Sequence, residues 1–344
     1  MSRENPNIER LLARFTGKKA DRTPNFEEII SKTQVEAILK KEVAGCTRSI
    51  TPDEYVELAL AIGMDAIVYY PHSGSGGEIF KKAGETSEQE KYFVTGSIKG
   101  WDDLDVIVAP DYHDNLEKLS DYKNATIGTD IGVCAWVCGP FTKCCLNMGY
   151  EDFLLKTYDD FEFVKMLMAI HMETLFNQVE VLLSVNDGVS FVTIGDDFAD
   201  NMGIMLNPKQ LEEIYFPEIK RLIQFIKSKG IAVMFHCCGN LGNVIPYFIS
   251  MGVDAVHPLQ SNVNDIFDLE KKFGQEICFV GNIGVTYPLA KGTPKDVRDD
   301  VRYHLENLAS SPGGYVLCSD HSISDAVPVE NFLVMVDEAF TFDM

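Results

Sequence analysis

The sequence lacks the features of a membrane-spanning protein and those of an exported protein. It has no uninterrupted apolar run approaching the roughly 20 residues that a membrane-spanning helix needs. Its opening stretch, MSRENPNIERLLARF, contains no apolar signal core and is typical of an amphipathic first helix. We therefore expect a cytoplasmic protein with no membrane partner.

Positive charge is scarce. The chain has 30 lysines and arginines against 52 aspartates and glutamates, a formal net charge of -22. Such a polyanion repels phosphate backbones and anionic lipid surfaces. This excludes nucleic acid as an expected partner and favours a small molecule or another protein.

A disulfide framework is also absent. The number of cysteines, nine, is odd and their spacing is irregular, which indicates reduced thiols in a cytoplasmic chain. Most of them are expected to pack as small apolar side chains. They are Cys46, Cys134, Cys138, Cys144, Cys145, Cys237, Cys238, Cys278 and Cys318.

The second half of the chain alternates short apolar runs with amphipathic stretches. Such alternation predicts parallel βα units. The expected strands are VSFVTIGDD (189–197), IAVMFHCCG (231–239), VDAVHPLQ (253–260), ICFVGNIG (277–284) and GYVLCSD (314–320). Upstream, MDAIVYYPHS (64–73) and ATIGTDIGV (125–133) are further candidates, and DDLDVIVAP (102–110) is a weaker one. In the helical stretch 207–230, Pro217 predicts a kink or a break into two helices.

About eight strands are what a (β/α)8 TIM barrel requires. The rival is an open, doubly wound sheet, but the glycine-rich stretch HSGSGGE (72–78) lacks the spacing of a dinucleotide fingerprint, so we interpret it as a mobile loop. The prediction is an α/β chain forming one domain over residues 1–344, with residues 1–50 as an N-terminal helical extension packed on the barrel.

Ligand-type and hydrogen-bonding side chains follow nearly every predicted strand. In a barrel these positions line one mouth, where active sites form. They are Tyr70 and His72; Asp196 and Asp197; His236, Cys237 and Cys238; His257 and Gln260; Asn282; and Cys318, Asp320 and His321.

His236 and Cys238 form an H-x-C pair at the end of one strand. Side chains two residues apart in a strand point the same way, so these two converge while Cys237 faces the opposite side and packs. Imidazole and thiolate together favour zinc over magnesium or calcium. A third ligand is expected from the last strand, which offers Cys318 and His321. The alternative is a buried histidine with two core cysteines.

These residues resemble the uroporphyrinogen decarboxylase superfamily. The resemblance is carried by GDDFADNMGIMLNPKQLEEIYFPEIKRLIQFIKSKGIAVMFHCCGN, with GVDAVHPLQ, FVGNIG and SDHSISDAVPVENF downstream and VCGPFTKCCLNMGYEDFL upstream, and it covers the chain from about Asp53 to the end. It implies a (β/α)8 barrel and one of two chemistries. These are cofactor-free decarboxylation of a porphyrinogen, and zinc-dependent methyl transfer to or from a corrinoid (cobalamin) protein.

The decarboxylase pattern fits poorly. The N-terminal motif of that family is arginine-rich, whereas RTPNFEEIISKTQVEAIL has no arginine after Arg22, and His72 stands where the essential aspartate is expected. The methyltransferase pattern fits better, because His236 and Cys238 match its H-x-C pair. The later cysteine of that pattern falls on His321, with Cys318 three residues earlier, so either one is the implied third ligand.

The resemblance therefore implies a zinc-dependent methyltransferase of anaerobic one-carbon metabolism. It would move methyl groups between a small donor (a methoxylated aromatic, a methylamine or a methyl thiol) and the cobalt of a corrinoid protein, as an O-demethylase does. Asp197 is the candidate proton donor or orienting group, and His257 is interpreted as a core histidine. The expected pocket residues are Tyr70, His72, Asp196, Gln260 and Asn282, although Asp196 could instead cap a loop. The alternatives are a decarboxylase and a non-catalytic zinc or ligand-binding protein. A homodimer is an option by analogy only.

Overall fold

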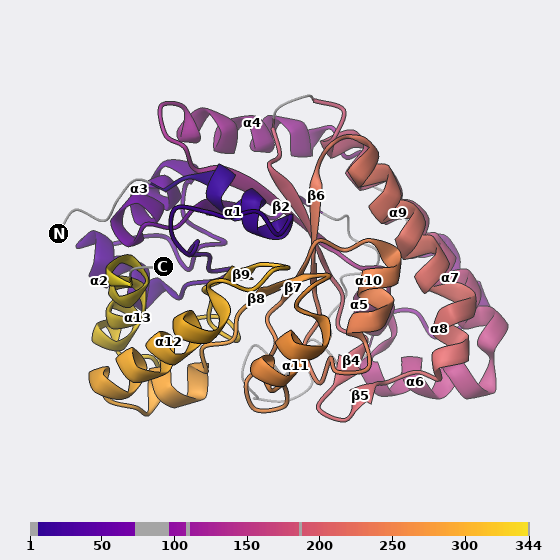
Figure 1. Ribbon diagram of the computed structural model, residues 1–344. Helices are drawn as coiled ribbons and strands as arrows, with labels where there is room; N and C mark the ends of the chain where they lie inside the picture. The colour runs from indigo at the N-terminus through magenta and orange to yellow at the C-terminus, as the bar shows by residue number, and fades with distance from the viewer. Residues whose placement is uncertain (1–5, 73–95, 108–110, 186–187, 343–344) are drawn as a thin grey trace.

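The computed structural model describes residues 6–72, 96–107, 111–185 and 188–342. Most of the predicted stretch 72–78 lies outside these residues. The described part contains a curled, parallel sheet of seven strands in the order β1-β2-β3-β6-β7-β8-β9, surrounded by helices (Figure 1). This is the α/β architecture of a TIM barrel, as the strand pattern predicted.

The strands of the sheet are short and their side chains are almost entirely buried. They are β1 (Ala66–Tyr69), β2 (Gly132–Cys138), β3 (Phe191–Gly195), β6 (Ala232–His236), β7 (Ala255–His257), β8 (Cys278–Val280) and β9 (Tyr315–Val316). A separate antiparallel pair, β4 (Ala199–Asp200) and β5 (Gly203–Ile204), follows β3.

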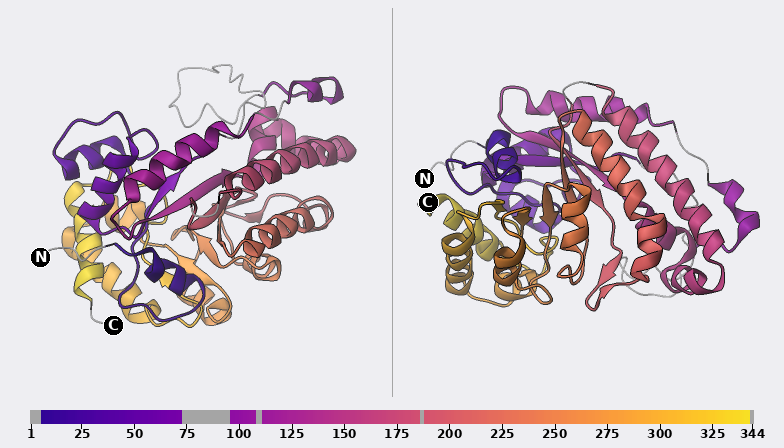
Figure 2. Two further views of the ribbon diagram at one scale, coloured as in Figure 1. Left: turned by 90° about the horizontal axis from the view of Figure 1, so that it is seen from above. Right: turned by 45° about the vertical axis from the view of Figure 1, so that its right-hand side comes forward.

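The helices that precede and follow the first two strands are α1 (Ile8–Phe15), α2 (Lys32–Leu39), α3 (Pro52–Ile62), η2 (Trp101–Val106), α4 (Asp114–Thr126), α5 (Pro140–Met148), α6 (Tyr150–Asp159) and α7 (Phe161–Leu182). The later ones are α8 (Pro208–Ile214), α9 (Phe216–Ser228), α10 (Ile245–Met251), α11 (Ile266–Phe273), η3 (Val285–Ala290), α12 (Pro294–Leu308) and α13 (Val329–Thr341). The views in Figures 1 and 2 place α7 beside α9 on the outside of the sheet, where the rings of Phe176 and Phe225 lie 5.0 Å apart. None of the helices in the described ranges is both long and apolar enough to cross a membrane.

The break at Pro217 is confirmed. The stretch 207–230 forms α8 and then α9, and Pro217 lies in the first turn of α9, where its missing N–H costs no helical hydrogen bond.

The eighth position of the ring is filled by a segment that the strand pattern did not indicate. Residues 24–30 run parallel to the chain after β9, with bridges from Asn25 to Leu317 and from Ile30 to Ile323. On their other side, the N–H of Asp65, directly before β1, donates to the carbonyl of Asn25 at 3.0 Å. Residues 24–30 therefore connect the last strand to the first.

Two predicted strands are placed differently. The expected strand at 102–110 is wrong over residues 102–106, which belong to η2 (Trp101–Val106), because Asp103 accepts the N–H groups of Lys99 and Gly100 and so caps a helical turn. Residues 108–110 of that stretch lie outside the described residues. The expected strand at 125–133 begins only at Gly132. Its first part belongs to the end of α4 and a turn, in which the hydroxyl of Thr129 donates to the carbonyl of Thr126 at 2.8 Å.

Candidate metal centre

The centre of the barrel mouth contains two histidines that end adjacent strands. His236 is the last residue of β6 and His257 the last residue of β7, and the two are paired in the register of these parallel strands. Paired residues in neighbouring strands point to the same side of a sheet. The Nδ1 atoms of the two rings accordingly approach to 2.8 Å.

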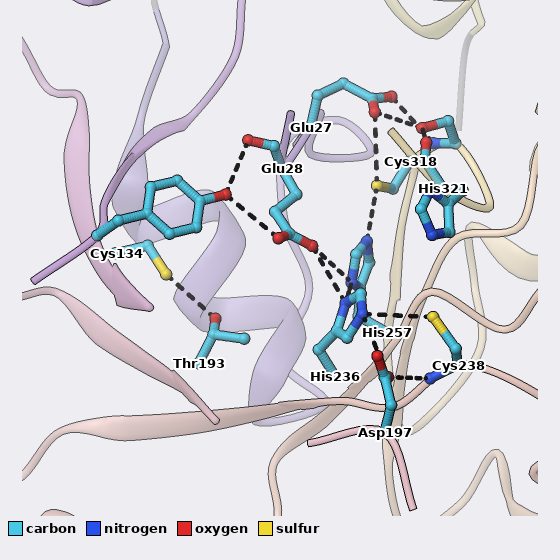
Figure 3. Close-up of polar contacts among 12 residues, drawn as sticks. Glu27, Glu28, Cys134, Thr193, Asp197, His236, Cys238, His257, Cys318 and His321 are labelled. Atoms are coloured by element: carbon cyan, nitrogen blue, oxygen red, sulfur yellow. Dashed lines mark hydrogen bonds and ion pairs between the residues drawn. The ribbon is translucent and has the colours of Figure 1, made fainter. Parts of the chain in front are cut away.

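His236 belongs to two groups of ligand-type side chains, one on each ring nitrogen (Figure 3). The inner trio consists of His236, His257 and Glu28. Its Glu28 Oε2 lies 3.1 Å from Nδ1 of His236 and 3.8 Å from Nδ1 of His257. All three residues are buried.

The outer trio consists of His236, Cys238 and Asp197. Nε2 of His236 lies 3.7 Å from Sγ of Cys238 and 3.8 Å from Oδ1 of Asp197. The N–H of Cys238 donates to the same carboxylate oxygen at 2.8 Å, so the thiol and the carboxylate are fixed relative to each other.

A buried chain of contacts continues from the inner trio away from the outer one. Nε2 of His257 lies 3.4 Å from Sγ of Cys318, which in turn lies 3.9 Å from Oε2 of Glu27. Glu27 also accepts the N–H and the hydroxyl of Ser319, at 2.9 and 2.5 Å. Burial raises the pKa of Glu27 to about 8, against the opposing effect of these hydrogen bonds.

The charges at the inner trio are mutually dependent. Burial opposes ionisation of Glu28, but His236, with smaller effects from His257 and Arg48, holds its pKa below its ordinary value. Burial likewise disfavours the cation of His236, yet Glu28 and then Cys238 raise its pKa well above the ordinary value. Burial and the charge of His236 lower the pKa of His257 to about 3. Glu28 and His236 thus shift each other's pKa toward the charged forms, whereas the pKa of His257 is shifted toward the neutral form.

A cavity of about 390 Å³ adjoins the outer trio. Its lining includes both Asp197 and Cys238 of that trio. The other lining residues are Thr142, Cys145, Tyr150, Ala199, Asp200, Asn201, Gly239 and Gln260. The lining of this cavity, as far as the structure describes it, contains two carboxylates and no lysine or arginine.

The predicted pocket residues divide into two groups. Tyr70 and Gln260 lie at the mouth: the Tyr70 hydroxyl donates to Oε1 of Glu28 at 3.2 Å, and Oε1 of Gln260 accepts the N–H of Gly239 at 2.7 Å. His72 is exposed, and its backbone is fixed by Asn115 and Gln178.

Asp196 and Asn282 are engaged in the surrounding structure. Asp196 is fully buried and accepts the N–H groups of Phe141 and Thr142 and the hydroxyl of Tyr215, at 3.1, 2.6 and 2.7 Å. These contacts cap the N-terminus of α5, whereas the alternative expected a cap on the loop that follows Asp196. Asn282 donates to the carbonyl of Leu259 and borders a different cavity.

The two proposed third ligands also differ in position. Cys318 is fully buried and contacts the far edge of the His257 ring. His321 is exposed on the following loop. Neither residue lines the cavity beside the outer trio.

Sequence reasoning missed Glu27 and Glu28 altogether and gave His257 a core role. The signal for the glutamates was the acidic pair in NFEEII, an otherwise apolar stretch. The signal for His257 was its equivalence to His236, since each is the last residue of a short apolar run.

The fold and this mouth define a TIM barrel whose strand ends bring imidazole, thiolate and carboxylate groups together. Residues 7–342 match the family model of uroporphyrinogen decarboxylase (URO-D), and the chain belongs to that family. It is similar to the methylcobamide:CoM methyltransferase MtbA of Methanosarcina mazei, with 23% identity over 224 residues. That match covers 63% of this chain and 62% of the relative.

A solved structure shares the fold over nearly the whole chain. It is a methyltransferase from Methanosarcina mazei, which is 17% identical and superposes with a TM-score of 0.72, covering 98% of each chain. At this identity the likeness concerns the fold.

Proposed function

We propose that the protein is a zinc-dependent methyltransferase that moves a methyl group between a small donor and the cobalt of a corrinoid protein. The observation that carries the proposal is the convergence of the His236 imidazole and the Cys238 thiol on one point at the barrel mouth, beside a cavity. The similarity to a methylcobamide:CoM methyltransferase supports the reaction class.

The residues present fit a zinc ion. Nitrogen and sulfur are the ligands zinc prefers, with bonds of about 2.0–2.1 and 2.3 Å, so tetrahedral ligands should lie about 3.3–3.6 Å apart. The separation between His236 Nε2 and Cys238 Sγ is 3.7 Å. Bound there, zinc would act as a Lewis acid on the heteroatom that carries the methyl group.

The protein residues supply position and electrostatics around that ion. Glu28 fixes the His236 ring through Nδ1, and Tyr70 in turn donates to Glu28. Gln260 secures the backbone after Cys238 by accepting the N–H of Gly239. A supported ligand set of this kind is what catalytic metal sites need in order to keep their geometry while the substrate exchanges.

The negative charge of the cavity lining indicates which substrates can bind there. Asp197 and Asp200 line it and no cation among the described lining residues balances them. Their field repels anionic substrates and favours neutral or cationic ones. This supports a neutral or cationic methyl donor, such as a methoxylated aromatic or a methylamine, with the corrinoid protein as the acceptor.

The test is a metal analysis followed by a transfer assay. The purified protein should contain about one zinc per chain, and only the zinc-loaded form should methylate a cobalt(I) corrinoid in the presence of one donor from a panel of methoxyarenes, methylamines and methyl thiols. Cobalt methylation is read from the visible spectrum. Equal turnover with and without zinc would refute zinc dependence, and decarboxylation of a porphyrinogen by the zinc-free chain would establish the alternative chemistry instead.

A further inference from the structure

We infer that Asp197 is the third protein ligand of the metal and that Glu28 orients His236 from the opposite ring nitrogen. This inference rests on the proposed function and makes it specific. It replaces the expectation that the last strand, through Cys318 or His321, supplies that ligand.

The first step concerns the two nitrogens of His236. A neutral imidazole offers one lone pair, and its other nitrogen carries a proton. The inner and outer trios therefore cannot both bind a metal through His236. Nδ1 already faces Glu28 Oε2 at 3.1 Å, a suitable acceptor for an Nδ1–H group. This leaves the lone pair on Nε2, which faces Cys238 and Asp197.

The second step is the spacing of the outer trio. Oδ1 of Asp197 lies 3.8 Å from Nε2 of His236, and all three ligand atoms lie within 4.8 Å of one another. Tetrahedral zinc with carboxylate, imidazole and thiolate ligands requires about 3.3–3.6 Å between them. The two separations that involve Nε2 of His236, 3.7 Å to the thiol and 3.8 Å to the carboxylate, are thus within about half an ångström of those values.

The third step is the support of Asp197. Its N–H donates to Oγ1 of Thr142 at 3.0 Å, and its carboxylate accepts the N–H of Cys238 at 2.8 Å. A ligating carboxylate is itself hydrogen-bonded in most metal sites. Asp197 is therefore held at the mouth from both its backbone and its side chain.

The fourth step separates Asp197 from the two competing residues. The thiol of Cys318 contacts Nε2 of His257, whose Nδ1 faces His236, so the His257 ring lies between Cys318 and His236. His321 is exposed on the loop after β9, and neither trio found among the described residues includes it. In contrast, Asp197 and Cys238 both line the cavity. A metal bound between them would direct its vacant position into that cavity, as a catalytic zinc requires.

The ligand set also narrows the substrate class. A carboxylate is a harder and less electron-donating ligand than a second thiolate, so it leaves the ion a stronger Lewis acid toward oxygen. This favours methyl ethers, whose oxygen leaving group gains most from such an ion, over methyl thioethers.

Cobalt(II) substitution tests the assignment without an activity assay, because a thiolate bound to cobalt(II) gives an intense near-ultraviolet charge-transfer band that oxygen and nitrogen ligands do not give. We expect the wild type to show the band and Cys238→Ser to lose it. Asp197→Asn keeps an acceptor for the N–H of Cys238 but removes the charge, and should weaken metal binding at least about 10-fold in competition with a chelator.

The matched control is Asp200→Asn, which removes a carboxylate from the same cavity lining, at a position where that carboxylate accepts only the N–H of Met202 among the described contacts. This variant, Cys318→Ser and His321→Gln should all bind metal within about threefold of the wild type and keep the band. A band that falls by about half in Cys318→Ser, or affinity that is lost in His321→Gln and kept in Asp197→Asn, would overturn the assignment while leaving a zinc methyltransferase intact. A wild type that binds no stoichiometric metal would refute the proposed function itself.

Discussion

The two sides of the His236 ring contrast in access and charge. The inner side meets Glu28 and His257 in a fully buried environment, and the outer side meets Cys238 and Asp197 beside a cavity. Both trios contain ligand-type atoms at metal-like spacing, so composition and distance alone do not separate a metal site from its support. Access to a substrate does, because a catalytic metal keeps one position open.

Removing the residue that both trios share should have the largest effect. In His236→Ala we expect zinc to fall from about one per chain to about a tenth or less, because neither trio retains enough ligands. Metal analysis after dialysis measures it, with methyl transfer lost in parallel. The control is His113→Ala, which removes an exposed histidine whose side chain pairs with Asp111, and it should retain zinc. Full zinc content in His236→Ala would show that neither trio is the zinc site.

The adjacent aspartates Asp196 and Asp197 offer a second contrast, between a structural and a metal-binding carboxylate. Asp196→Ala removes the acceptor for two backbone N–H groups and the Tyr215 hydroxyl in a buried setting. We expect it to lower the free energy of unfolding by about 3 kcal/mol, measured by denaturant titration. The residual folded protein should bind cobalt(II) with wild-type affinity, whereas weakened metal binding at unchanged stability would reverse the assigned roles.

The adjacent glutamates Glu27 and Glu28 allow a comparison between a residue that contacts His236 and a neighbour that does not. Glu28→Gln should weaken zinc binding by about 10-fold, because it removes the charge that orients His236 and raises its ligand strength. Glu27→Gln is the matched control, since Glu27 contacts Ser319 and Cys318 instead of His236. Competition with a fluorescent chelator gives both values. Equal zinc affinities in the two variants would show that Glu28 does not position His236.

A buried histidine outside both trios should give the smallest effect. His171 on α7 is buried, and burial together with the charge of Lys143 lowers its pKa to about 3. Below the ordinary histidine pKa of about 6.5, the unfolded chain therefore binds a proton that the folded chain does not. The stabilisation is complete above that pH and is lost as the pH falls toward 3. The free energy of unfolding should drop by about 1 kcal/mol between pH 6.5 and 5.5.

In His171→Phe this pH slope should be shallower than in the wild type. Denaturant midpoints at several pH values provide the comparison. An unchanged slope in His171→Phe would show that another group causes the loss of stability.

The sequence patterns predicted the fold where strands are continuous and apolar. The runs around His236, His257 and Cys318 became β6, β7 and β9 because short, mainly apolar runs that end in polar residues suit strands buried on both faces of a parallel sheet. The segment 24–30 escaped detection because it contains two glutamates, and because its pairing with Leu317 and Ile323 joins residues almost 300 positions apart.

The candidate site was predictable only in part for a related reason. His236 and Cys238 are two residues apart, so strand geometry alone brings them together. Glu28 meets His236 only because the N-terminal segment fills the eighth position of the ring. Which of Asp196 and Asp197 caps α5 depends on the direction of the chain after β3, which the sequence does not specify.

X-ray absorption at the zinc edge of the zinc-loaded wild type tests the central claim most directly. The outer trio predicts one sulfur neighbour at about 2.3 Å, with nitrogen and oxygen neighbours at about 2.0–2.2 Å, and no sulfur neighbour in Cys238→Ser. Two sulfur neighbours would show that Cys318 binds the metal. A wild-type spectrum without sulfur would place the ion at Glu28, His236 and His257, and would contradict the account.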